Sequence, residues 1–176
     1  GSGSLAAWYA ASCLCAMLDN NLQSKERLLR TPLDAESNVN LLDRVMASLV
    51  RAKPLDLRDE RALVVTALLR LLCVWCDRCG PAVQAMLRGE HALRWLVETA
   101  TSAADMHVAG HAALLLGQCL RSRCDASTAV REVLLTRVGI DAFLAPLDKV
   151  RRSAEFQVRS ELRVLCFFLC VFFVFF

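Results

Sequence analysis

Three cysteines spaced three residues apart, Cys73, Cys76 and Cys79, are the residues of this chain that most resemble a metal or redox site. An iron–sulfur run of this kind would continue with a fourth cysteine and then a proline, and Val83 occupies the position of that cysteine. A zinc site would need one further ligand, for which the candidates are His91, Cys119 and Cys124. The run lies in an apolar, helix-forming stretch, where thiols pack as small hydrophobic groups. We therefore expect Cys73 to be buried, and predict neither bound metal nor a disulfide among the three.

Two histidines, His107 and His111, are four residues apart and would share one face of a helix, a spacing that can bind zinc. The zinc-protease motif also requires a glutamate after the first histidine, where this chain has Val108, and no third ligand is evident. The chain has only seven glycines and shows neither a glycine-rich phosphate loop nor a nucleophile-elbow pattern. The sequence therefore predicts no catalytic, cofactor-binding or metal-binding residues, no cofactor and no enzymatic activity.

The composition favours a packed, helical, intracellular protein. Hydrophobic residues make up 56% of the 176 residues, above the ~45–50% usual for soluble domains, which fits repeats buried against neighbours on both sides. The net charge is +3 with both signs interspersed, and only Arg151-Arg152 forms a basic cluster, so we expect no nucleic-acid binding. The nine cysteines come without a secretory signal or a disulfide-scaffold spacing, which is typical of a reducing, cytosolic compartment.

The elements that would position any functional residue are helices, and they recur in threes. Helix-forming segments are predicted at residues 8–18, 25–30, 39–49, 63–75, 82–88, 92–100, 109–120, 129–137 and 140–150. The middle segments, marked by Leu29, Leu87 and Leu135, lie 58 (29 to 87) and 48 (87 to 135) residues apart. Repeats of ~40–47 residues with two or three helices are typical of HEAT and armadillo arrays. We therefore predict an all-α fold, a right-handed α-solenoid of armadillo/HEAT-like three-helix repeats with about nine helices and no sheet.

Several local features refine this prediction. The longest helix is expected to run through residues 59–79 with Trp75 on its apolar face, so Trp75 should anchor the core. Gly80-Pro81 should end that helix and start the next. The small residues Gly110, Ala112, Ala113 and Gly117 should allow a close helix contact. Residues 125–128 are predicted to form a loop and cap before the eighth helix.

The chain divides into a leader, a repeat region and a C-terminal segment. Residues 1–4 have the composition of an added linker and are predicted to lie outside the fold. Residues 5–155 are predicted to hold about three repeats. Since their first helix is apolar and lacks a convincing cap, we interpret them as part of a longer array.

Residues 156–176 form the C-terminal segment, which ends in the Phe-rich apolar tail at residues 164–176. That tail is shorter than the ~20 apolar residues that a membrane-spanning helix needs. Three interpretations stay open: a final helix packed on the solenoid, a membrane-seeking tail, or a segment of non-native sequence.

Five sequence stretches, in order, resemble the globular head of one protein family. They are W-x-A-A from Trp8, N-x-x-x-K-E-x-L-L-R from Asn21, L-L-x-L-L-C-x-W from Leu68, G-x-x-A-L-L-L-G from Gly110 and R-x-G-x-x-x-F from Arg137. On these residues the chain is identified as resembling the armadillo-like head of the general vesicular transport factor family, the vesicle-tethering golgins of the Golgi. The resemblance covers roughly residues 7–150.

This resemblance implies a cytosolic protein that is peripheral on Golgi membranes and transport vesicles and acts in ER-to-Golgi and intra-Golgi transport. It implies protein partners, namely a Rab-type small GTPase, SNAREs and golgins, membrane association through those partners, and a homodimeric parent protein. It supplies no partner-binding residues, because the matching positions are mostly apolar. From the sequence we expect binding through polar helix surface near the loops at residues 31–38 and 120–128.

Two alternative functions remain at this point. A generic armadillo/HEAT adaptor would bind an extended peptide along a groove, but a ladder of groove asparagines is missing, since Asn38 and Asn40 fall in one loop. The other alternative is a metal- or redox-regulated switch that uses Cys73, Cys76 and Cys79.

Overall fold

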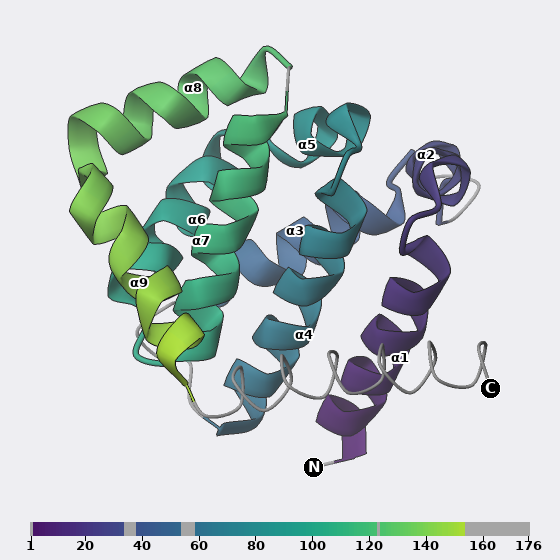
Figure 1. Cartoon of the computed structure of the whole chain (residues 1–176). Coiled ribbons are helices and arrows are strands. Elements are labelled where there is room, and N and C mark those ends of the chain that lie inside the picture. The colour runs from purple at the N-terminus through teal and green to yellow at the C-terminus, as the bar shows by residue number, and fades with distance from the viewer. Residues whose placement is uncertain (1, 34–37, 54–58, 123, 154–176) are drawn as a thin grey trace, which may run out of the picture.

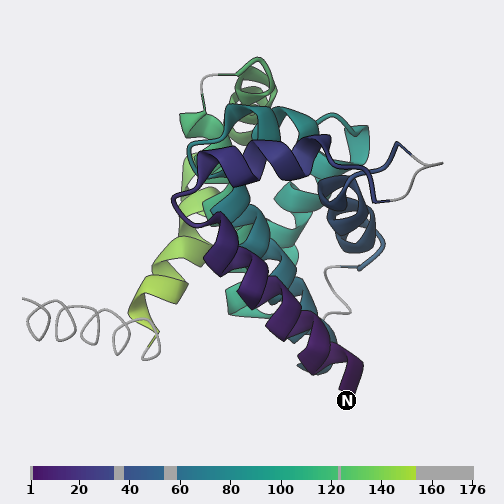
Figure 2. The ribbon, with the colours of Figure 1, turned by 90° about the vertical axis from the view of Figure 1, so that its right-hand side faces the viewer.

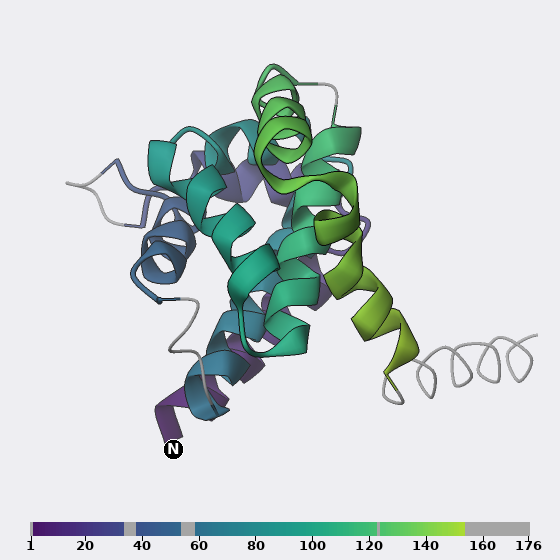
Figure 3. The same ribbon diagram turned by 90° about the vertical axis from the view of Figure 1, so that its left-hand side faces the viewer.

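The computed structural model describes residues 2–33, 38–53, 59–122 and 124–153. Helices α1 (Ser2–Leu18), α4 (Asp59–Cys76) and α7 (Met106–Arg121) form a row through this part of the chain. α1 packs along α4 and α4 packs along α7, although each pair is separated by two other helices in the sequence. Figure 1 shows the three side by side, and Figures 2 and 3 view the stack from its two ends, with α1 in front in Figure 2 and α9 in front in Figure 3.

The remaining helices complete three groups of three. α2 (Leu22–Arg30), α5 (Gly80–Met86) and α8 (Ala126–Val133) lie across the C-terminal ends of α1, α4 and α7, at the top of Figure 1. α3 (Leu41–Val50), α6 (Glu90–Ser102) and α9 (Ile140–Arg152) are the third helices. Counterparts again contact one another, since α2 packs on α5, α3 on α6 and α6 on α9. The prediction of an all-α fold is confirmed for the described residues, where β structure is limited to one isolated bridge between Pro32 and Asn40.

The helix ends agree with the sequence at some positions and differ at others. α4 stops at Cys76, one turn earlier than predicted, because Arg78 adopts a left-handed conformation with φ of 56°. Cys79 is therefore not on α4 but forms the N-cap of α5, and Pro81 lies in the first turn of α5 as predicted. α8 starts at Ala126, three residues earlier than predicted, and continues into a π-helical segment, Leu134–Val138, that ends at Gly139 with φ of 82°.

The core lies between the row and the third helices. Trp75 is 0% exposed, and it is the largest of the fully buried side chains, so its predicted role as a core residue is confirmed. Its fully buried leucine neighbours in the hydrophobic core come from α1, α3, α4, α6 and α7: Leu18, Leu42, Leu49, Leu69, Leu72, Leu96, Leu115 and Leu116. Cys73, Cys76 and Cys79 are buried in the same core, which confirms the predicted burial of Cys73.

The predicted close contact at Gly110 lies between α7 and α9. A Cβ atom built on Gly110 would collide with the side chain of Val150, and the carbonyl oxygen of Pro146 lies 3.6 Å away. Gly117 lies about two helical turns further along α7. The nearest atom to a Cβ built there is Cζ of Phe143, at an ordinary contact distance of 3.8 Å. Gly110 therefore sets how closely α9 approaches α7.

The two predicted chain ends differ in what the structure describes. α1 begins at Ser2, so it includes three residues of the predicted linker. Residues 156–176, with the Phe-rich tail, lie outside the described residues. Within the described part, none of the helices is long and apolar enough to cross a membrane.

Candidate functional site: a partner-binding surface

The residues that could have formed a metal site are instead engaged in packing. Burial raises the pKa of the Cys73 thiol to about 12 and that of Cys76 well above its usual value. The Cys73 thiol donates to the carbonyl of His111 at 3.6 Å, and Nδ1 of His111 lies 2.7 Å from the carbonyl of His107. Among the described residues, no group of three or more His, Cys, Asp or Glu side chains is placed to hold a metal ion.

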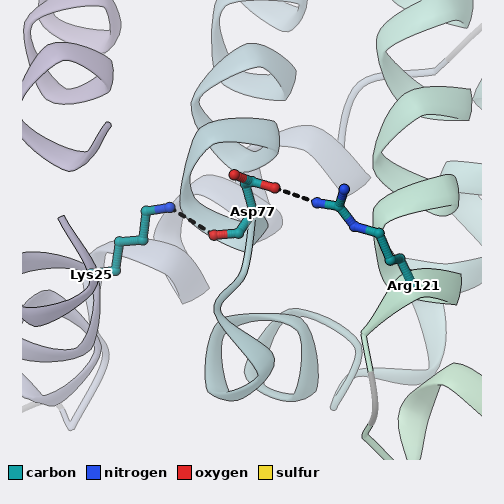
Figure 4. A network of polar contacts seen from close by, with 3 residues as sticks. All are labelled: Lys25, Asp77 and Arg121. Atoms are coloured by element: carbon teal, nitrogen blue, oxygen red, sulfur yellow. Dashed lines mark hydrogen bonds and ion pairs between the residues drawn. The ribbon is translucent and has the colours of Figure 1, made fainter. Parts of the chain in front are cut away.

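A polar network links the three helix groups near the end of α4 (Figure 4). Lys25 of α2 is only 4% exposed, and its ammonium group donates to the backbone carbonyl of Asp77 at 2.8 Å. The carboxylate of Asp77 accepts from Nη2 of Arg121, at the end of α7, at 2.5 Å. Because hydrogen bonds to charged groups are roughly twice as strong as neutral ones, this network stabilises the alignment of α2, α4 and α7.

A groove opens beside this network, between the ends of α4 and α7 and the start of α5. This helix-end groove has a volume of about 390 Å³ and is lined by Cys76, Arg78, Cys79, Gly80, Gln118, Arg121 and Ser122. Arg78 and Arg121 are both exposed, while Cys76 and Cys79 are buried. The groove therefore combines a floor of buried thiols with two cationic side chains on its rim.

The loop that follows α7 borders the same groove. The hydroxyl of Ser127 donates to the carbonyl of Ser122, and the hydroxyl of Ser122 donates to the thiol of Cys124 at 3.5 Å. Burial acts to raise the pKa of Cys124, but hydrogen bonds from Ser127, Ser122 and the backbone of Ala126 outweigh it and lower the pKa below its usual value. Of the described cysteines, Cys124 thus has a pKa shift opposite in direction to those of Cys73, Cys76 and Cys119.

The comparison with known families decides what kind of protein carries this surface. Residues 2–164 match the family described as Uso1 / p115 like vesicle tethering protein, head region. The chain belongs to this vesicle-tethering family. The resemblance found in the sequence is thereby confirmed.

A named relative supports the same assignment. The chain is 26% identical over 165 residues to "Golgin candidate 6" of Arabidopsis thaliana, a match that covers 84% of this chain and 18% of that protein. The chain therefore spans less than one fifth of the length of this golgin candidate.

In this tethering head, one helix face carries apolar residues without a neighbour in the described structure. The outward side of α1 exposes Leu5 (53%), Tyr9 (61%) and Met17 (65%), with small residues between them. α1 carries no charged residue at all along its length. At the other end of the row, Leu135 and Ile140 are about equally exposed. Both ends of the stack thus present apolar surface.

A larger groove of this head region lies between the end of α3 and the first half of α4, with Ser4 of α1 at its edge, and has a volume of about 660 Å³. Leu49 and Val65 form buried parts of its wall, and Arg51, Lys53 and Arg61 lie on its rim. The rim also carries Glu60, whose carboxylate accepts from the hydroxyl of Ser4 at 3.1 Å. The lining of this groove thus carries three basic side chains and one acidic side chain.

Sequence reasoning located the neighbourhood of the site but missed its central residues. The predicted loop at residues 120–128 includes Arg121 and Ser122, which line the helix-end groove. The other predicted loop, at residues 31–38, falls partly outside the described residues. Lys25 and Arg78 were not expected, and the available signal was Lys25 itself, a lysine that shares the apolar face of α2 with Leu28 and Leu29.

Proposed function

We propose that this chain is part of a non-enzymatic vesicle tether that acts in ER-to-Golgi and intra-Golgi transport by binding other proteins. The observation that carries the proposal is the match of residues 2–164 to the head region of vesicle-tethering proteins. The golgin relative supports a place at the Golgi, and the lack of a spanning helix among the described residues is compatible with a peripheral protein. We place the parent protein in the cytoplasm, held on Golgi membranes and vesicles through its partners.

The arrangement of the helices supports a solenoid as the architecture of the head. Counterpart helices of successive groups pack on one another, as they do in stacks of armadillo-like repeats. We propose that residues 5–155 form about three repeats of a right-handed α-solenoid. The apolar outer side of α1 would then pack against a helix of a neighbouring repeat, just as α4 packs against α1.

The partners in this proposal are a Rab-type GTPase, SNAREs and golgins, with a homodimeric parent protein. A solenoid presents an extended curved surface, so partners bind across several repeats instead of entering one deep pocket. The polar network of Lys25, Asp77 and Arg121 supports this mode, since it fixes three helix groups relative to one another next to an open groove.

The generic peptide-binding adaptor is not favoured. Its groove would need asparagine side chains free to bind a peptide backbone. Asn40 is engaged within the fold: its side chain accepts from the backbone of Asp43 at 2.9 Å and donates to the carbonyl of Leu29 at 3.1 Å. Asn40 therefore caps α3 and cannot serve as part of a peptide ladder.

A vesicle-capture experiment tests the proposed function. Full-length parent protein would be fixed on beads, incubated with transport vesicles and Golgi-derived cytosol, and the bound vesicles counted. We expect vesicle capture to be lost when the head region is deleted. Capture should be kept in a control protein that retains the head and carries an unrelated helical domain of equal length fused at its opposite terminus. Equal capture with and without the head would contradict the proposal.

A further inference from the structure

The helix-end groove carries an excess of positive charge that the fold itself does not neutralise. Arg78 and Arg121 both line the groove, and the carboxylate of Asp77 pairs with Arg121 alone, because Lys25 donates to the backbone carbonyl of Asp77. The other nearby carboxylate, Glu26, forms an ion pair with Arg30 at 3.6 Å. Arg78 makes no hydrogen bond or ion pair with any described residue.

The two rim arginines have donors left to offer a ligand. A guanidinium group has five N–H donors in a planar fork that matches a carboxylate, and Arg121 uses one of its nitrogens on Asp77. The ion pair with Asp77 positions Arg121 at the groove. The amide of Gln118 and the hydroxyl of Ser122 add polar groups to the same wall.

The groove floor increases the strength of such contacts. Cys76 and Cys79 are buried thiols with raised pKa values, because burial disfavours their charged forms, so the floor stays uncharged. An ion pair beside an apolar floor is less screened by water than one on an open surface. At about 390 Å³ the groove lies at the lower end of the ~300–1,000 Å³ range of ligand pockets, which suits a side chain better than a folded domain.

We propose that the helix-end groove binds an acidic segment of a partner protein, with Arg78 and Arg121 receiving aspartate or glutamate side chains. This rests on the proposed function only in that the partner is a protein. The recognition mode is the binding of acidic motifs by clustered arginines. The matching acidic segment would lie across the ends of α4 and α7, over the dashed contacts drawn in Figure 4.

Binding of a labelled hexaglutamate peptide to the full-length parent protein tests this site by fluorescence anisotropy. The variant Arg78→Gln removes one rim charge without breaking a described contact. Arg94→Gln removes an equal charge from an exposed position on α6, outside the groove. We expect about a tenfold weaker affinity for Arg78→Gln, less than about a twofold change for Arg94→Gln, and weakening of the parent by added salt.

Two results would overturn the inference, provided that circular dichroism shows the variant to be folded. One is equal affinity of the parent and Arg78→Gln for hexaglutamate. The other comes from a parallel measurement of binding to phosphatidylserine vesicles. If Arg78→Gln weakens binding to the vesicles but not to hexaglutamate, the groove binds a lipid surface instead of an acidic protein segment. The vesicle-capture assay with the same parent protein is independent of the peptide, so failure of this inference and failure of the proposed function can be told apart.

Discussion

Lys25 and Trp75 join α2 to the end of α4 through two hydrogen bonds, one from each side chain. The indole Nε1 of Trp75 donates to the backbone carbonyl of Lys25 at 3.1 Å. In return, the ammonium group of Lys25 donates at 2.8 Å to the carbonyl of Asp77, two residues after Trp75. Both side chains are buried away from water, so these bonds satisfy the indole N–H and the ammonium group inside the fold. The lysine thus has a structural reason to be inside the fold.

Truncation of Trp75 should be strongly destabilising. Trp75→Ala removes the largest fully buried side chain and leaves the carbonyl of Lys25 without its donor, so we expect a loss of ~3–5 kcal/mol in the free energy of unfolding. Urea unfolding followed by circular dichroism measures it. Trp8→Ala, at a half-buried tryptophan of α1, is the matched control and should cost clearly less. A Trp75→Ala variant that melts within a few degrees of the parent would contradict the position of Trp75 in the core.

Two glycines of α7 should respond to the same substitution in opposite ways. Gly110→Ala places a methyl group against Val150 and should destabilise by about 1–3 kcal/mol through overpacking. Gly117→Ala meets only an ordinary contact with Phe143, so it should be neutral or stabilising by ~0.4–1 kcal/mol through lower backbone entropy when unfolded.

The cause of the Gly110 effect can be isolated with a third variant. In a Val150→Ala background, Gly110→Ala should lose most of its penalty, because the colliding side chain is absent. Thermal unfolding of the four-protein cycle gives the coupling energy. A penalty unchanged by Val150→Ala would mean that the close approach of α9 to α7 is not its cause.

Cys124 should be alkylated faster than the five described cysteines whose pKa values are raised, namely Cys15, Cys73, Cys76, Cys79 and Cys119. Its pKa is lowered by hydrogen bonds, so a larger fraction is thiolate near neutral pH, whereas Cys73 and Cys119 have pKa values of about 12. Timed iodoacetamide labelling with peptide mass spectrometry ranks the sites. Ser122→Ala removes the hydroxyl that donates to the Cys124 thiol and should slow labelling of Cys124, while Ser102→Ala, at an exposed site on α6, should not. Faster labelling of Cys73 than of Cys124 in the folded protein would refute this order.

Alkaline pH should destabilise the fold through its buried thiols. Burial raises the pKa of Cys73 and Cys119 from 9.0 to about 12, so these thiols stay protonated in the folded state after the unfolded chain has ionised. Their contribution is complete below pH 9 and is lost progressively as the pH rises from about 9 to about 12. Unfolding free energies across that range should fall, and they should fall less steeply in a Cys73→Ala, Cys119→Ala variant. Equal slopes in the two proteins would argue against these raised pKa values.

The sequence predicted the order of the helices well because the apolar periodicity of each helix and the residues that start and stop it are local signals. Gly139, for example, ends the π-helical continuation of α8, since a positive φ is easiest for glycine. The end of α4 could not be predicted in the same way. There the left-handed position is taken by Arg78, and Gly80, the residue that suggested a helix stop, is already helical.

The candidate site was less predictable than the fold because it depends on contacts between distant residues. Lys25 and Asp77 are 52 residues apart, and Asp77 and Arg121 are 44 apart. In a sequence each of them is an ordinary charged residue on a helix or at its end. Only the packing of α2, α4 and α7 brings these residues together, at the C-terminal ends of α4 and α7 beside the groove.

Binding of Rab proteins to the full-length parent protein tests the central claim most directly. Immobilised Rab GTPases of the early secretory pathway would be loaded with either GTP or GDP and exposed to the parent protein, whose location in cells is recorded in parallel. The account predicts binding to at least one GTP-loaded Rab that is lost with GDP, together with localisation to early secretory membranes. A parent protein that shows neither nucleotide-dependent Rab binding nor that localisation would contradict the tether and return the generic solenoid adaptor as the better account.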